Sequence, residues 1–181
     1  MDFPVKKIMI PINLTHQVIL THPLHARLLS PHTPSIGSSD PLPAATTPLR
    51  RMLSTMLTFF ADAYKSTFGF ENGPPLHDAL TIAYVAHSEL FRCKRYRVDV
   101  ELAGSHATGE TVVDIWDYRS CDESWGPSGK NCLVAESVDV RTRFPRLLRP
   151  TLTSLQVPGF FDFLLECIER CDQGSPLNVT K

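Results

Sequence analysis

The sequence predicts only one strand ahead of its first three helices, and this shortage of strands limits the folds open to the chain. Residues 6–12 (KKIMIPI) form a short apolar run typical of a buried strand. Helix-type patterns follow at residues 13–29, 49–68 and 78–91. A doubly wound α/β sheet normally has a strand between successive helices, because each helix crosses over to the next parallel strand. We therefore expect an α/β fold in which strand 6–12 lies at an uncovered sheet edge.

Prolines and glycines mark the boundaries between these elements. Residues 30–48 contain five prolines among nineteen positions, a composition that excludes a helix or a central strand and predicts a Pro/Ser-rich loop. Gly69 is expected to end the helix over residues 49–68.

The second half of the chain changes to strand-type patterns. Apolar and charged residues alternate over 96–102, and residues 111–115 form a second apolar run, so we expect an antiparallel hairpin. Another strand is expected at residues 132–138, and an amphipathic helix at residues 160–171 closes the chain.

The composition is that of an ordinary globular protein. Hydrophobic residues make up 43% of the 181 positions, charged residues make up 20%, and the formal net charge is -1. Because no basic excess is present, we expect no nucleic-acid polymer as a partner. The first apolar run is interrupted by Pro11 and is too short for a signal-peptide core or a membrane span, which favours a cytoplasmic protein without a membrane partner. Five cysteines without a Cys-x-x-Cys pair favour reduced thiols.

The stretch GPPLHDAL, residues 73–80, combines two chemically useful side chains. His77 and Asp78 stand side by side at a predicted helix start, behind two prolines. Histidine can give or take a proton near neutral pH, and a carboxylate suits Ca²⁺ or Mg²⁺. The alternative is structural, because Asp is a common helix N-cap and a loop histidine is commonly only solvated. Spacing alone favours the structural alternative.

Three longer stretches resemble one enzyme family. Residues 6–21 (KKIMIPINLTHQVILT), 68–91 (FGFENGPPLHDALTIAYVAHSELF) and 96–116 (YRVDVELAGSHATGETVVDIW) together resemble the C-terminal half of inosine-uridine-preferring nucleoside hydrolases. GPPLHDAL is the most specific piece, and residues 114–137 are similar to fungal members. The resemblance extends from about residue 5 to residue 172. It implies a partial nucleoside hydrolase fold, with a Rossmann-like, mainly parallel sheet and a late antiparallel hairpin, in one incomplete domain over residues 1–181.

The resemblance also implies an activity, hydrolysis of the N-glycosidic bond of purine or pyrimidine ribonucleosides to free base and ribose. In this family Ca²⁺ binds the ribose hydroxyls and a water, and an Asp takes the proton of that water. His77 matches the histidine that protonates the leaving base, and Asp78 matches a calcium ligand. Tyr64 either matches an aromatic residue lining the base pocket or packs in the core. A ribonucleoside is thus the expected partner, and homo-oligomerisation stays open.

One part of the family pattern has no counterpart in this sequence. The family carries an Asp-x-Asp-Pro-Gly-x-Asp-Asp cluster, whereas the acids before Asp62 are only Asp2 and Asp40. Ca²⁺ takes about six to eight oxygen ligands, so Asp78 with waters makes a poor site. The water-activating base, worth about 10²–10⁴-fold in rate, is absent as well. We therefore expect a family member without its N-terminal half, inactive as this chain alone. The alternative is a non-catalytic remnant that binds a partner through exposed apolar surface.

Residues 140–156 (VRTRFPRLLRPTLTSLQ) look inserted between two segments that are nearly continuous in the family. The stretch holds four arginines and no acid. It is a basic surface patch, a solvated loop or a translated intron, and we favour the intron.

Deleting residues 140–156 is expected to leave the free energy of unfolding unchanged or to raise it, because no pattern in this stretch marks it as part of the core. Urea denaturation of the deletion variant and of the full chain measures the difference. A large loss of stability would show that the segment belongs to the fold.

Overall fold

The computed structural model describes residues 5–34, 36–118, 129–140 and 159–179. The chain divides into two compact units, Met1–Leu14 with Phe91–Val138 and Thr15–Leu90 with Asp139–Lys181. The first unit holds the sheet and the second holds most of the helices. Residues 141–156 of the predicted insertion lie outside the described residues. Within the described part, no helix combines the length and the apolar character needed to cross a membrane.

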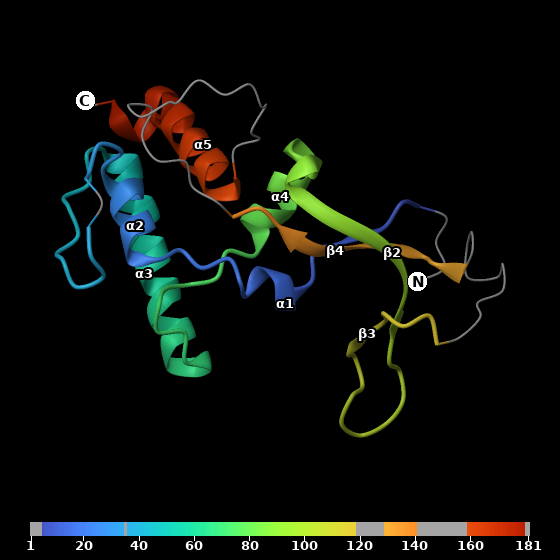
Figure 1. The fold of residues 1–181 in the computed structure, drawn as a ribbon. Helices are drawn as coiled ribbons and strands as arrows, with labels where there is room; N and C mark the ends of the chain where they lie inside the picture. Colours follow the sequence, from blue (N-terminus) through green and yellow to red (C-terminus); the bar gives the residue numbers. More distant parts are fainter. Residues whose placement is uncertain (1–4, 35, 119–128, 141–158, 180–181) are drawn as a thin grey trace. The chain divides into compact units, whose positions relative to one another are not determined.

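The first unit is built on a mixed four-stranded sheet (Figure 1). Strand β1 pairs with β4 in parallel, whereas β2 pairs with β4 and with β3 in antiparallel fashion. The spatial order is β1-β4-β2-β3. The predicted α/β fold with a late antiparallel hairpin is therefore confirmed. The described sheet is mixed rather than mainly parallel, because two of its three strand pairings are antiparallel. The strands are β1 (Ile8–Met9), β2 (Phe91–Val100), β3 (Thr111–Asp114) and β4 (Cys132–Val138).

The edge position of β1 is also as predicted, but its length and burial are not. Only Ile8 and Met9 are in strand conformation, and none of residues 5–12 is buried. Pro11 has no N–H to donate to a ladder, and β1 has β4 as its one strand partner in the described sheet. A strand that pairs on one side and is uncovered stays short and half-exposed.

The β2–β3 hairpin is antiparallel, as predicted, and differs from the prediction in extent. Pairing runs from Arg97 with Asp114 to Val100 with Thr111. Strand β2 begins at Phe91, because residues ahead of the hairpin pair with β4. Leu102, expected inside the strand, lies beyond its end and is 85% exposed.

The core of the first unit forms where β2 and β4 pair. Tyr96, Val98, Cys132 and Val134 are buried together. Beside them, the buried side chain of Asn131 accepts a hydrogen bond from the Val98 N–H and donates one to the Val98 carbonyl, both at 2.8 Å. This side chain completes the backbone pairing of β2 just ahead of β4.

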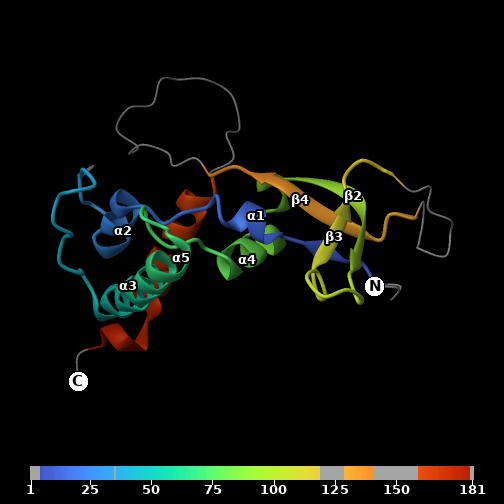
Figure 2. The same ribbon diagram turned by 90° about the horizontal axis from the view of Figure 1, so that it is seen from below.

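The second unit contains helices α2, α3, α4 and α5, with α2 packed against both α3 and α5 (Figure 2). The predicted helices 49–68 and 160–171 are confirmed, and Gly69 ends α3 with a left-handed φ of 72°. The predicted helix 78–91 ends early, at Ala86. The helix bounds are α1 (Ile12–Thr15), α2 (His22–Leu29), α3 (Pro48–Phe68), α4 (Asp78–Ala86) and α5 (Phe160–Gly174), with short 3-10 turns at Ser88–Leu90 and Pro176–Asn178.

The first predicted helix, residues 13–29, is wrong as a single element. It is two short helices, α1 and α2, separated by an extended segment. Pro23 lacks an N–H for the helical ladder and its ring would clash with the preceding turn, so it fits the first turn of α2 rather than a helix interior.

A buried ion pair joins α3 to the end of α5. Arg50 is 2% exposed, and its Nε donates to Asp172 Oδ2 at 2.7 Å. Arg50 Nη1 donates to the Leu28 carbonyl at 2.7 Å, so this one guanidinium links α2, α3 and α5. Burial alone would raise the pKa of Asp172, but hydrogen bonds from neighbouring side chains and the charge of Arg50 hold that pKa below its ordinary value of 3.8.

Replacing Arg50 is expected to be strongly destabilising. Arg50→Met should lower the free energy of unfolding by about 3 kcal/mol or more, because it leaves the Asp172 carboxylate without its charge partner. The neighbouring Arg51 is exposed, and Arg51→Met should change the free energy by less than about 0.5 kcal/mol. Urea denaturation compares the two variants, and equal effects would contradict a structural role for the ion pair.

Candidate functional site

The loop that carries His77 begins with a glycine that accepts no side chain. Gly73 has a φ of 125°, and a Cβ at this position would lie 2.2 Å from the carbonyl oxygen of Leu20. Glycine is therefore required both by its backbone conformation and by the close approach of the two chain segments. Pro74 and Pro75, which follow it, are buried.

Backbone pairing fixes this loop against the segment between α1 and α2. The Leu20 N–H donates to the Pro74 carbonyl and the Leu76 N–H donates to the Val18 carbonyl, each at 3.0 Å. Ile19 and Pro75 form an antiparallel bridge between these bonds. The pairing places the residues just before it, Thr15 and His16, beside the residue just after it, His77.

Both ring nitrogens of His77 are hydrogen-bonded to hydroxyl groups. Nδ1 lies 2.7 Å from Thr15 Oγ1, and Nε2 lies 2.7 Å from the hydroxyl oxygen of Tyr64 on α3. A hydroxyl can donate or accept, so it matches either tautomer of a neutral imidazole. His77 is thereby held from two sides by side chains of separate segments.

The surroundings of His77 favour its neutral form. Burial lowers the pKa of His77 below its ordinary value of 6.5, and the nearby His16 lowers it further. The carboxylate of Asp78 acts in the opposite direction without cancelling these effects. At neutral pH the imidazole is therefore uncharged and carries one N–H and one free electron pair.

Aromatic rings surround the Tyr64–His77 pair. The ring centroids of Tyr64 and His77 are 5.6 Å apart, and those of His16 and His77 are 5.5 Å apart. Phe60 stacks on Tyr64 at 5.2 Å, and Phe70 meets His16 edge-on at 5.1 Å. The result is a cluster of flat rings that includes the imidazoles of His16 and His77, a surface suited to a planar aromatic ligand.

Asp78 is the first residue of α4, and His77 occupies the N-cap position. The structural alternative of an Asp78 cap is therefore wrong in detail, although a carboxylate in the first turn still interacts favourably with the helix dipole. Asp78 is exposed. The described residues contain no group of three or more His, Cys, Asp or Glu side chains able to hold a metal ion. A lone carboxylate does not fit the six to eight oxygens that Ca²⁺ takes, so these residues do not form a calcium site by themselves.

The three residues selected from the sequence fall in one place. Tyr64 and His77 are in direct contact, and Asp78 is the next residue. Sequence analysis assigned no role to Thr15 or His16, which complete the cluster. The signal that could have identified them is their position a few residues after the predicted strand 6–12, because polar residues that follow a strand of an α/β sheet commonly lie at a binding site.

Known proteins that are similar to this chain come from one enzyme family. The family model described as "Inosine-uridine preferring nucleoside hydrolase" matches residues 2–144. A Dictyostelium discoideum protein named "Probable ribonucleoside hydrolase" is 30% identical over 167 residues, covering 92% of this chain and 39% of its own length. The uridine nucleosidase of Saccharomyces cerevisiae is 32% identical over 81 residues, 45% of this chain and 20% of its own length.

Solved structures share the fold at lower identity. A purine-preferring ribonucleoside hydrolase from Gardnerella vaginalis superposes with a TM-score of 0.55 at 24% identity, over 75% of this chain and 36% of that one. A plant nucleoside hydrolase gives a TM-score of 0.56 at 16% identity, over 95% of this chain and 42% of that one. The chain thus spans about two fifths of the length of its most extensively matched relatives.

Proposed function

Since the chain belongs to the inosine-uridine preferring nucleoside hydrolase family, we propose that it provides the leaving-group side of a ribonucleoside hydrolase site. The observation that carries the proposal is the position of His77, held at both nitrogens by Thr15 and Tyr64 among flat aromatic rings. Residues 1–181 form one part of the hydrolase domain in this proposal.

The proposed step is protonation of the departing base by His77. As the bond between C1′ of the ribose and the base nitrogen breaks, its electron pair stays on the base, and a proton from His77 neutralises it. The donor is the imidazolium form of His77, which the lowered pKa makes a minority species at neutral pH and, for the same reason, a stronger acid. The imidazole takes up from solvent water the proton that it donates. In this step Thr15 keeps its hydrogen bond to Nδ1 and orients the ring, while the base nitrogen displaces the Tyr64 hydroxyl from Nε2. The aromatic cluster stacks against the base.

In this proposal, activation of the attacking water and most of the Ca²⁺ ligands are supplied by polypeptide other than this chain. The sequence offers no aspartate cluster to activate the attacking water, and Asp78 alone does not hold Ca²⁺. We therefore expect the chain alone to release base from inosine or uridine at an undetectable rate. A chimaera that joins the N-terminal half of the Dictyostelium relative ahead of this chain is expected to be active and calcium-dependent.

In that chimaera, His77→Ala is expected to slow inosine hydrolysis more than hydrolysis of p-nitrophenyl riboside. The nitrophenolate group departs without a proton, so only the purine substrate needs the histidine. Steady-state kcat/KM for both substrates measures the difference. His106→Ala, which removes an exposed histidine from a loop of the other unit, is the matched control and should affect neither substrate. Equal slowing of both substrates by His77→Ala would leave His77 with a positioning role only.

Asp78→Asn in the same chimaera is expected to weaken Ca²⁺ binding, because an amide oxygen replaces an anionic ligand. Isothermal titration with Ca²⁺ measures the affinity without turnover. Asp62→Asn removes an exposed carboxylate from α3 and should leave the affinity unchanged. Unchanged affinity in Asp78→Asn would remove Asp78 from the metal site.

The alternative function, a non-catalytic remnant that binds a partner, predicts no nucleosidase activity in the chimaera. The names of the relatives include purine-preferring and uridine-cleaving enzymes, so inosine and uridine are both assayed.

A further inference from the structure

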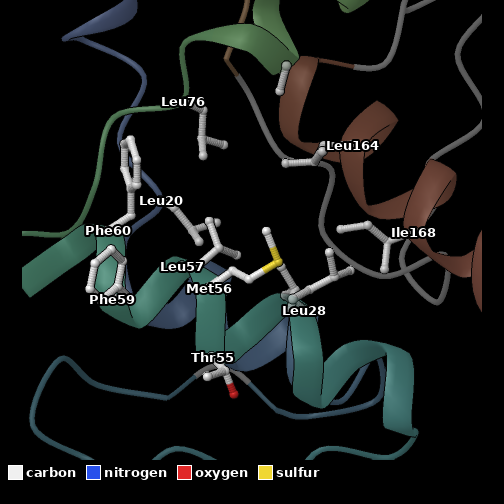
Figure 3. A pocket seen from close by; sticks show the side chains of 12 residues that line it. Leu20, Leu28, Thr55, Met56, Leu57, Phe59, Phe60, Leu76, Leu164 and Ile168 are labelled. Atoms are coloured by element: carbon white, nitrogen blue, oxygen red, sulfur yellow. The ribbon is translucent and has the colours of Figure 1, made fainter. Parts of the chain in front are cut away.

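The second unit has an apolar groove that adjoins the aromatic cluster around His77, because Phe60 borders both. It has a volume of about 660 Å³ and lies where α3 faces the middle of α5 and the loop ahead of α4 (Figure 3). Met56 extends from α3 into the space between Leu28 of α2 and Ile168 of α5. Among the twelve side chains that line the groove, Thr55 alone is polar and none is charged.

This lining does not suit a nucleoside. A ribose carries hydroxyl groups that need hydrogen-bond partners when they leave water, and the groove offers almost none. An apolar occupant would release ordered water and gain dispersion contacts instead.

Helix α3 forms one wall of the groove and is uncovered along its apolar face. Met56 is 61% exposed and Phe59 is 74% exposed. Both are large apolar side chains, three residues apart on the same amphipathic helix, and such side chains are usually buried. In this fully described helix Arg50 alone is buried. Large contiguous apolar surfaces of this kind mark interaction sites in soluble proteins.

We infer that this groove is the docking surface for the polypeptide segment that supplies the rest of the nucleoside hydrolase fold. The solved relatives have the same fold, and this chain covers only 36% and 42% of two of them, so more than half of each solved chain has no counterpart here. In a layered α/β fold an apolar helix face is buried against another element. The occupant is thus a protein segment with a complementary apolar face and no charge at its centre.

The test measures association, so its result is independent of whether the site turns over nucleosides. The part of the Dictyostelium relative without a counterpart here is co-expressed with this chain as a separate polypeptide. A one-to-one complex is expected in size-exclusion chromatography with light scattering, and analytical ultracentrifugation gives its Kd.

Charged substitutions in the groove identify the surface. Met56→Glu and Phe59→Glu are each expected to weaken the complex about tenfold or more, because a charge would be buried in an apolar contact. Thr58→Glu places the same charge on the same turn of α3 outside the groove and should stay within about twofold of the parent. All three positions are exposed, so circular dichroism should show parent-like melting of each variant alone.

Three results would overturn the inference. They are the absence of a complex, a complex whose affinity Met56→Glu leaves unchanged, and a dimer of this chain alone that Met56→Glu dissociates. The last result would identify a second copy of the chain as the occupant of the groove.

Discussion

The candidate site depends on a short piece of backbone pairing, two hydrogen bonds that join residues 18–20 to residues 74–76. These bonds bring together side chains that are sixty residues apart in sequence. Without them Thr15 would have no fixed position relative to His77, and the imidazole would be held by Tyr64 alone. Because the bonds are between backbone groups, the site is positioned by the chain path rather than by side-chain packing.

The helical unit relies on a different kind of interaction. Its apolar helix α3 is largely exposed, so the attachment of this helix to its neighbours rests strongly on the buried pair of Arg50 and Asp172. A buried ion pair is a costly way to join helices, because both charges lose hydration. Here the guanidinium recovers that cost through the Leu28 carbonyl and the carboxylate through neighbouring side chains. Polar contacts thereby hold a unit in which the apolar face of α3 is uncovered among the described residues.

The sequence predicted elements well where periodicity was long and sustained. Helix α3 and the β2–β3 hairpin were expected at nearly their observed positions, because many consecutive residues repeat one pattern. Prediction was wrong over residues 13–29, where an apolar run fits a helix or an extended segment and long-range pairing with residues 74–76 decides between them. The Asn131 contact with Val98 was also missed, since no local pattern encodes a side chain that replaces backbone pairing.

The candidate site was predicted only in part, because sequence patterns show local neighbours and not long-range contacts. His77 and Asp78 are adjacent in a distinctive motif, whereas Thr15 and His16 join them only through the fold. Gly73 then has a consequence for engineering the ring cluster around His77. The Leu20 carbonyl oxygen occupies the space that a side chain at Gly73 would need, so this turn does not tolerate substitution. A mutagenesis library at this position would therefore consist mainly of unfolded variants. Variation is better directed to the rings of Phe60 and Phe70, which border the cluster without carrying the backbone pairing.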